Sequence, residues 1–198
     1  LKEYKSDPRL YDDYNGIKIL RAPILTRGKS KLKLLINYAS FFLSASFIAA
    51  FKLKNQKFDL VFANQLSPIT SVIPGIIIKK SKKIPLVLWI LDLWPDTLAD
   101  LNYFKKDGFI FRLMDWLSGW IYHKTDVILV QSEAFKLSIK RSCKEEKKVI
   151  FRPNWAESIF QKEFNKKSLS VRASENKGLH ILFAGNIGAA QDFNSIIK

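Results

Sequence analysis

Four polar side chains that could bind or transform a substrate stand directly after apolar segments of the chain. Asp92 follows "PLVLWIL", and Asn64, Ser132 and Asn154 hold similar positions after other apolar runs. In open α/β sheets, ligands bind beyond the carboxyl ends of the parallel strands. We therefore predict that Asp92 contributes to substrate binding or catalysis. Asn64, Ser132 and Asn154 are predicted substrate-binding residues that rank below it.

Each of these residues also has a structural explanation. Ser132 has the position of an N-cap for the following helix, and Asn154 could close a turn. Asp92 could bond a neighbouring backbone N–H. The second acid of "WILDLWPD", Asp96, is predicted to be an N-cap rather than a catalytic group. A metal site at Asp92 and Asp96 would need further ligands that the sequence does not supply, so no metal is expected.

The segment "FAGNIGAAQDF" has the pattern of a strand, a tight turn and the start of a helix. Backbone N–H groups and the helix dipole at such a turn favour a phosphate group. Gly185, Asn186 and Gly188 are therefore predicted to bind phosphate, although a plain strand-to-helix turn has the same pattern.

The elements that must position these residues alternate between short apolar runs and helical patterns. Runs that are apolar throughout indicate strands buried on both faces of a parallel sheet. The alternation predicts right-handed βαβ units and a doubly wound α/β domain. Pro74 predicts that one helix is kinked or starts late. The expected strands are "GIKILRAP", "FDLVFAN", "IPLVLWIL", "DVILVQS", "KVIFRPN" and "LHILFAG", and the expected helices are residues 33–54, 68–80, 108–124 and 133–141.

The chain carries a net charge of +15, from 33 Lys and Arg against 18 Asp and Glu. Such a field attracts polyanions, including anionic lipid and phosphate-bearing substrates. The charge clusters in "RGKSKLK" and "KKSKK", which could equally be solvated faces. No RNA-binding signature accompanies these runs, so nucleic acid is not the expected partner. The single cysteine, Cys143, excludes an internal disulfide.

Residues 34–51, "LLINYASFFLSASFIAAF", contain no charged side chain. Asn37, Ser40 and Ser44 share one helical face, leaving Phe41, Phe47, Ile48 and Phe51 elsewhere. We expect a helix packed on the sheet with an apolar side near lipid, and flanking lysines that meet anionic headgroups. A core helix and a transmembrane helix are the alternatives. The interfacial interpretation implies a cytoplasmic protein that is peripheral on the inner face of the cytoplasmic membrane.

Several of these motifs resemble one known family. "LDLWPDTL", "SEAFK", "RPNWAE" and "FAGNIGAAQDF" occur in the order and spacing seen in bacterial group 1 glycosyltransferases, which are family four of the GT-B fold. The chain is most similar to the O-antigen, capsule and colanic acid type, including fucosamine transferases. "DYNGIKILRAPI" and "LLINYASFFLSASFIAA" also resemble that subgroup.

The resemblance implies two Rossmann-like domains. Residues 1–175 would be the N-terminal, acceptor-side domain, incomplete at its start and including a linker within 156–177. Residues 176–198 would begin the C-terminal domain that binds the sugar nucleotide. The paired glutamates of that domain, eight positions apart in the family, have no counterpart in this sequence. We therefore expect residues 1–198 to be a fragment that does not transfer sugar alone.

The resemblance also implies an activity. The full-length protein would transfer a sugar, with retention at the anomeric carbon, from a nucleotide-sugar donor to a lipid-linked saccharide or polyprenyl-diphosphate acceptor in surface polysaccharide synthesis. Gly185, Asn186 and Gly188 would hold the donor diphosphate, with no metal or other cofactor. Many relatives have a histidine that binds the donor 6-hydroxyl at the position of Leu91, so a 6-deoxy donor is expected. The alternatives are a non-catalytic membrane- or polyanion-binding module and a sugar-nucleotide epimerase of the same architecture.

Overall fold

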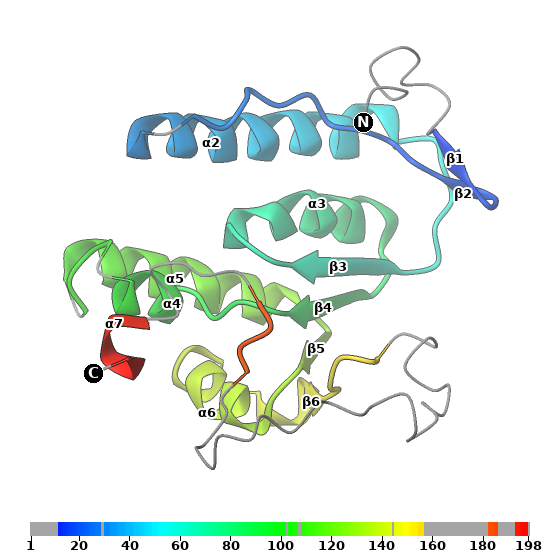
Figure 1. The fold of residues 1–198 in the computed structure, drawn as a ribbon. Helices are drawn as coiled ribbons and strands as arrows, with labels where there is room; N and C mark the ends of the chain where they lie inside the picture. Colours follow the sequence, from blue (N-terminus) through cyan, green and yellow to red (C-terminus); the bar gives the residue numbers. More distant parts are fainter. Residues whose placement is uncertain are drawn as a thin grey trace, which may run out of the picture.

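The fold is a mixed α/β domain built on a parallel sheet (Figure 1). The computed structural model describes residues 12–28, 30–101, 103–106, 108–143, 145–156, 182–185 and 193–197. Its sheet has the strand order β3-β4-β5-β6, and all three strand pairs are parallel. The strands are β3 (Val61–Gln65), β4 (Leu86–Ile90), β5 (Val127–Val130) and β6 (Val149–Phe151). This arrangement is Rossmann-like and confirms the α/β fold class.

Helices connect the strands as the sequence predicted. The connections hold α3 (Ile73–Lys82), then α4 (Asp96–Asp100) and α5 (Phe109–Lys124), then α6 (Glu133–Ser142) and η4 (Glu146–Lys148). A 3₁₀ turn, η3 (Ile69–Val72), precedes α3, and Pro74 lies in the first turn of that helix. A proline is tolerated there because its missing N–H would have no partner in the helix. The late start predicted from Pro74 is therefore confirmed.

The helices that connect the strands cover one face of the sheet. The strand order runs in one direction, and right-handed crossovers then place every connecting helix on the same side. Alternate residues of β4, represented by Leu88, are fully buried there with Ile76 of α3, Ile121 of α5 and Ile139 of α6. On the opposite face, Phe62 is exposed. The expectation of strands buried on both faces is thus not met within the described part of the chain.

Two expected strands are not strands of this sheet. Residues 16–23 instead contribute to a small antiparallel hairpin of β1 (Asp13–Tyr14) and β2 (Ile17–Lys18). The turn residues Asn15 and Gly16 have positive φ angles of 52° and 85°, which suits the Asn-Gly hairpin turn. In the last predicted strand, residues 182–185 are irregular, and residues 179–181 lie outside the described part. A short helix, α7 (Phe193–Ile196), is described further on.

The apolar helix expected over residues 33–54 forms α2 (Lys31–Phe47), which continues as a π-helix, η2 (Ile48–Lys52). The Ser30 hydroxyl caps α2 by accepting a hydrogen bond from the Lys33 amide at 3.2 Å. α2 packs against α3, on the side of α3 away from the sheet, rather than on the sheet itself (Figure 1). The predicted contact with the sheet was therefore wrong, because α3 already occupies that position.

At the amino edge of the sheet, Asp126 joins three elements. Its Oδ2 accepts hydrogen bonds from the Leu86 amide and from Lys79 Nζ, each at 2.7 Å. Burial alone would raise the pKa of this carboxyl, but the bonds and charge of Lys79 and the Leu86 amide outweigh it and hold the pKa below its ordinary value. A lowered folded-state pKa means that the carboxylate stabilises the fold above the unfolded pKa of about 3.9. This contribution is lost as pH falls through the folded pKa.

We expect Asp126→Asn to lower the free energy of unfolding at pH 7 by about 1 kcal/mol, a figure reduced for solvent screening because the side chain is partly exposed. The difference from the unsubstituted chain should shrink as pH falls below about 4. Urea unfolding at both pH values measures this. The matched control is Asp59→Asn, at an exposed position before β3. A loss for Asp126→Asn that stayed constant down to pH 2 would contradict the electrostatic explanation.

Candidate functional site

The carboxyl ends of the four strands meet at one edge, and the predicted site residues lie along it. The Leu91 amide donates to the Gln65 carbonyl at 3.0 Å, and the Arg152 amide donates to the Val130 carbonyl at 2.8 Å. These bonds extend the strand register past the last residue of β4 and of β6. As a result, Asn64 near the end of β3 and the segments after β4, β5 and β6, which carry Asp92, Ser132 and Asn154, lie along this edge in the order of the sheet.

A glutamine that the sequence analysis missed links two of the predicted residues. Gln131 Nε2 donates to the Leu91 carbonyl at 3.0 Å, and Gln131 Oε1 accepts from Asn154 Nδ2 at 2.9 Å. Because the donor and the acceptor of this amide are both used, its orientation is fixed. Asn154 therefore bonds to the end of β5 rather than closing a local turn. The available signal was the place of Gln131 directly after "VILV", one residue before Ser132.

Asp92 is the acid at this edge whose charge is not compensated. Its side chain is half-buried, and the described residues supply it with no hydrogen bond or ion pair. A carboxylate in this position can accept hydrogen bonds from ligand hydroxyls or take a proton from one of them. The geometry leaves the Asp92 carboxylate accessible to a substrate, and its role in substrate binding stays a prediction.

Asp96, by contrast, is paired. Its two carboxylate oxygens accept from Arg141, with Oδ1 to Nη1 at 3.2 Å and Oδ2 to Nη2 at 2.9 Å. Pro95 holds the N-cap position of α4, and Asp96 is the first helical residue. The predicted N-cap role of Asp96 was therefore wrong. Its negative charge instead lies in the first turn, where it suits the helix dipole and the Arg141 guanidinium.

Ser132 is the N-cap of α6, which was the structural alternative to substrate binding. Its Oγ accepts a hydrogen bond from the Ala134 amide at 3.2 Å and caps α6. The hydroxyl hydrogen can still be donated to a ligand, so capping and substrate binding are compatible. Substrate contact by Ser132 stays a prediction.

An apolar groove opens beside the end of β3. Its cavity volume is about 270 Å³. Asn64 lines it, together with apolar and small polar side chains from the segment before α2, from α2 itself and from the loop after β3. These residues are Ile24, Asn37, Tyr38, Phe41, Leu66, Ser67, Pro68 and Ser71. The wall formed by the first segment is held in place because the Leu25 amide donates to Ser40 Oγ at 3.0 Å and Asn37 Nδ2 donates to the Leu25 carbonyl.

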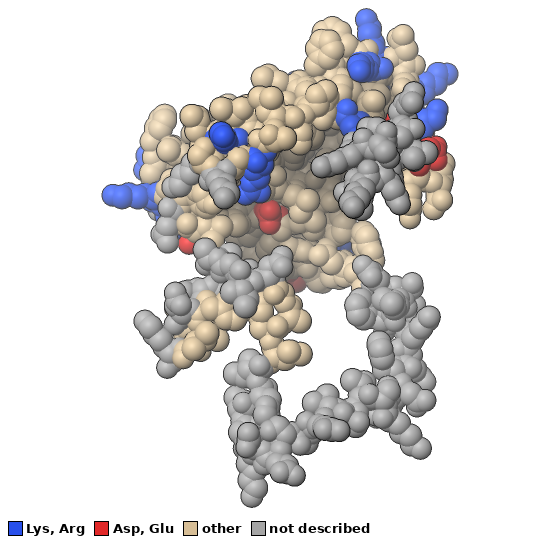
Figure 2. All heavy atoms as spheres, turned by 45° about the horizontal axis from the view of Figure 1, so that its top comes forward, with Lys and Arg blue, Asp and Glu red and all other residues tan. Residues whose placement is uncertain are grey.

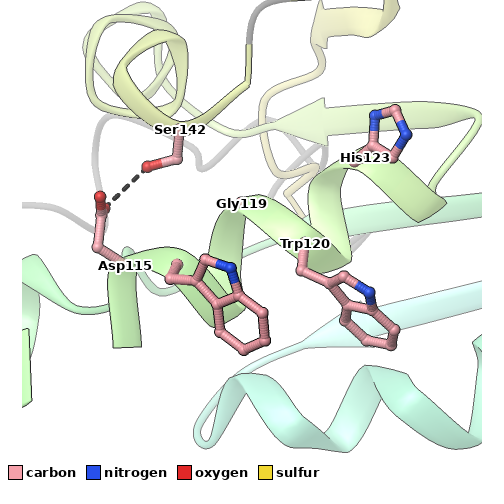
Figure 3. Close-up of a pocket in the computed structure, with 6 residues that line it drawn as sticks. Asp115, Gly119, Trp120, His123 and Ser142 are labelled. Atoms are coloured by element: carbon pink, nitrogen blue, oxygen red, sulfur yellow. Dashed lines mark hydrogen bonds between the residues drawn. The ribbon is translucent and has the colours of Figure 1, made fainter. Parts of the chain in front are cut away.

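A second groove lies between α5 and α6 and contains none of the predicted residues (Figure 3). Its polar groups bond one another: Ser142 Oγ donates to Asp115 Oδ1 at 2.8 Å, and Arg141 pairs with the same oxygen at 3.1 Å. A Cβ at Gly119 would lie 3.0 Å from the Ser142 carbonyl oxygen, so glycine permits this close approach of the helices. The groove therefore has a structural explanation as a helix–helix contact.

The predicted phosphate turn is only partly within the described chain. Gly185 is exposed and lies at a bend, whereas Asn186 and Gly188 fall outside the described residues. Among the described residues, no group of three or more His, Cys, Asp or Glu side chains is placed to hold a metal ion. Phosphate binding at residues 185–188 stays a prediction.

Comparison with known proteins gives one informative relationship. The chain is similar to "Probable glycosyltransferase WbjE" of Pseudomonas aeruginosa, with 26% identity over 115 residues. The match spans 57% of this chain and 28% of that protein. No family model matches the chain. The similarity supports a relationship to glycosyltransferases in general, without assigning a subgroup.

The matched region is little more than a quarter of the length of that protein. Among the described residues, the Asp92 carboxylate has no partner, and Gln131 bonds the backbone carbonyl of Leu91. The apolar groove adds a surface of different chemistry next to Asn64. One part of a ligand could therefore bind the polar side chains at the carboxyl edge, and another part could bind in the apolar groove.

Proposed function

We propose that the full-length protein transfers a sugar from a nucleotide-sugar donor to a lipid-linked acceptor, with retention at the anomeric carbon, in the synthesis of a surface polysaccharide. The observation that carries this proposal is the Asp92 carboxylate at the carboxyl edge of a parallel sheet, which has no partner among the described residues, in a chain similar to a probable glycosyltransferase. The similarity supports sugar transfer. The acceptor, the stereochemistry and the pathway are our extension.

The polar edge would bind the reacting sugars. Asp92 would accept hydrogen bonds from sugar hydroxyls, and Asn64 and Asn154 would add amide donors and acceptors. Bonds to a charged group are stronger than neutral ones, so Asp92 should dominate. The turn at Gly185, Asn186 and Gly188 would hold the donor diphosphate through backbone N–H groups. We propose that basic side chains would stabilise the leaving diphosphate and that no metal cofactor takes part.

The apolar groove beside Asn64 supports a lipid-linked acceptor. Its walls include Ile24, Phe41, Leu66 and Pro68, which would bury hydrocarbon, whereas the amide of Asn64 would meet a polar group. A polyprenyl diphosphate or a lipid-linked saccharide has both kinds of chemistry in one molecule. A free monosaccharide acceptor would leave the apolar walls unused.

The experiment that tests this function is a screen of the full-length protein against a panel of nucleotide sugars, with and without a polyprenyl-diphosphate-linked saccharide. Mass spectrometry should detect a lipid product one sugar larger than the acceptor. Conversion of nucleotide sugars without any acceptor would instead indicate an epimerase. If neither product forms across the panel, the transferase proposal fails and a non-catalytic binding module becomes the better description.

The position of Leu91 leads to a prediction about the donor. Its backbone N–H and carbonyl are both hydrogen-bonded, and its half-buried side chain is not one of those packed in the hydrophobic core. A leucine cannot pair with a hydroxyl, and an unpaired buried hydroxyl costs about 1–3 kcal/mol. Packing against a methyl group gains about 0.8 kcal/mol. We therefore expect kcat/KM to favour a 6-deoxy donor, such as an N-acetylated fucosamine or quinovosamine nucleotide, by about tenfold to a few hundredfold.

Matched donors with and without the 6-hydroxyl measure this preference. Leu91→His should narrow it by supplying a hydrogen-bond partner, whereas the control Leu91→Met keeps an apolar side chain and should preserve it. A preference for the hydroxylated donor in the unsubstituted protein would show that Leu91 has no part in donor selection.

A further inference from the structure

α2 carries large apolar side chains on its exposed side, unlike an ordinary surface helix. Its half-buried polar side chains Asn37 and Ser40 bond the backbone of Leu25, in the segment that precedes the helix. Its outward side carries large apolar side chains that are each between 43% and 67% exposed. They are Leu32, Leu35, Ile36, Leu43, Phe47 and Phe51. An ordinary surface helix of a water-soluble domain would carry polar side chains on that exposed side.

The exposed side chains form one continuous surface along the helix, which we call the α2 outer face. Positions 32, 36, 39, 43 and 47 recur at helical spacing, and the Phe47 and Phe51 rings extend the surface with their centroids 4.7 Å apart. At 1.5 Å per residue, the 21 residues from Leu32 to Lys52 measure about 32 Å. Ile48 does not belong to this face because it is buried, which corrects its expected place near lipid.

The charged side chains on the helix of the α2 outer face have one sign. Neither α2 nor η2 contains an acidic residue, and the exposed lysines Lys33, Lys52 and Lys54 stand at the two ends. Figure 2, which turns this side toward the viewer, shows a broad uncharged band with Lys and Arg side chains toward its ends, and a few acidic side chains beside the right-hand group and below the band. A partner that covers this face must therefore be apolar in its middle and negative at its surface. Anionic lipid bilayers have that chemistry.

We propose that the α2 outer face docks on an anionic membrane surface, with the helix lying in the plane of the interface. Leu43, Phe47 and Phe51 would enter the boundary between headgroups and acyl chains, and the flanking lysines would contact the headgroups. This inference goes beyond the proposed sugar transfer and does not depend on it, because lipid binding requires no donor or acceptor.

Length and composition alone would also allow this helix to cross a bilayer. An 18-residue stretch of Leu32–Lys52 has a mean hydropathy of 1.8, and only 11% of that stretch is buried inside the protein. The contacts of α2 favour the interface. Crossing would separate the helix from α3 and would place the amide of Asn37 and the hydroxyl of Ser40 in hydrocarbon, where unpaired polar groups are costly. Lying flat keeps those bonds and exposes the apolar side alone.

Vesicle flotation with the full-length protein tests the docking. Binding should be strong with vesicles of phosphatidylglycerol and phosphatidylcholine, weak with phosphatidylcholine alone, and reduced by salt. The double variant Leu43→Gln, Phe47→Gln should bind the anionic vesicles at least tenfold more weakly. The control, Leu60→Gln, Leu137→Gln, removes two exposed leucines elsewhere and should bind normally.

The lysines provide a second, independent arm. Lys33→Gln and Lys52→Gln should each weaken binding about fivefold, whereas Lys140→Gln and Lys147→Gln, at exposed positions on the α6 side, should have little effect. Circular dichroism must show that every variant is folded. Protein that resists carbonate extraction from vesicles would indicate a spanning helix and overturn the proposal. The proposal also fails if the double variant Leu43→Gln, Phe47→Gln retains vesicle binding. It fails likewise if the only effect of that double variant is to convert a dimer into a monomer.

Discussion

Asp92→Asn in the full-length protein should lower kcat/KM for sugar transfer by about tenfold to a hundredfold, while the melting temperature stays within about 2 °C of the unsubstituted value. Asparagine keeps the size of the side chain and removes its charge, so a hydroxyl that bonded the carboxylate loses a charge-assisted bond worth about 1.5–3 kcal/mol. If Asp92 also accepts a proton, the loss should reach about 10²–10⁴. Stability should barely change because the described residues give the Asp92 carboxylate no partner to lose.

The matched control is Asp100→Asn, which removes the same charge at an exposed position eight residues further along the chain. That variant should keep both its activity and its melting temperature. Steady-state kinetics and a thermal melt of the two variants separate the possibilities. Full activity in Asp92→Asn would refute a role at the substrate site. A fall of many degrees in its melting temperature would instead indicate that the carboxylate supports the fold.

Much of the fold could be predicted because local patterns carry it. The runs around Leu88 and Ile128 are apolar throughout, and they form adjacent parallel strands. Pro74 marks the delayed start of α3 for a purely local reason. The hairpin at Asn15 and Gly16 also has a local signal, the Asn-Gly pair, which the prediction of a strand over residues 16–23 did not use.

The remaining features depend on contacts between distant residues. Asp96 pairs with Arg141, and no pattern around Asp96 indicates a partner 45 positions away. Gln131 joins Leu91 and Asn154 only because β4, β5 and β6 are aligned in one register. The asymmetry of α2 was visible in the sequence, but which side faces the protein is decided by α3 and by the bonds to Leu25.

The segment that follows β4 contains the carboxylate of Asp92 and, two residues later, the buried side chain of Trp94. Trp94 is 8% exposed and belongs to the core cluster. Its Nε1 donates to Ser67 Oγ at 3.2 Å, and its carbonyl accepts from Ser118 Oγ at 3.2 Å. Pro95 beside it is also fully buried. Two residues before this anchor, Asp92 is held at the carboxyl edge without a bond from its own carboxylate, so the surrounding backbone fixes its position.

Trp94→Ala should therefore lower the free energy of unfolding by about 3–5 kcal/mol, the usual cost of removing a large aromatic side chain from a core. That is a large share of the stability of an ordinary domain, and a fraction of the protein should be unfolded even without denaturant. Trp94→Phe keeps most of the ring and should lose about 1 kcal/mol with the bond to Ser67. Urea unfolding measures both variants against Trp116→Ala, which removes an exposed tryptophan of α5 and should change little. Equal stability of the two alanine variants would show that Trp94 does not stabilise the core.

The same variants should also differ in activity. Trp94→Phe should keep most of its activity, because the backbone that carries Asp92 stays in place. Activity in Trp94→Ala should fall in proportion to the folded fraction.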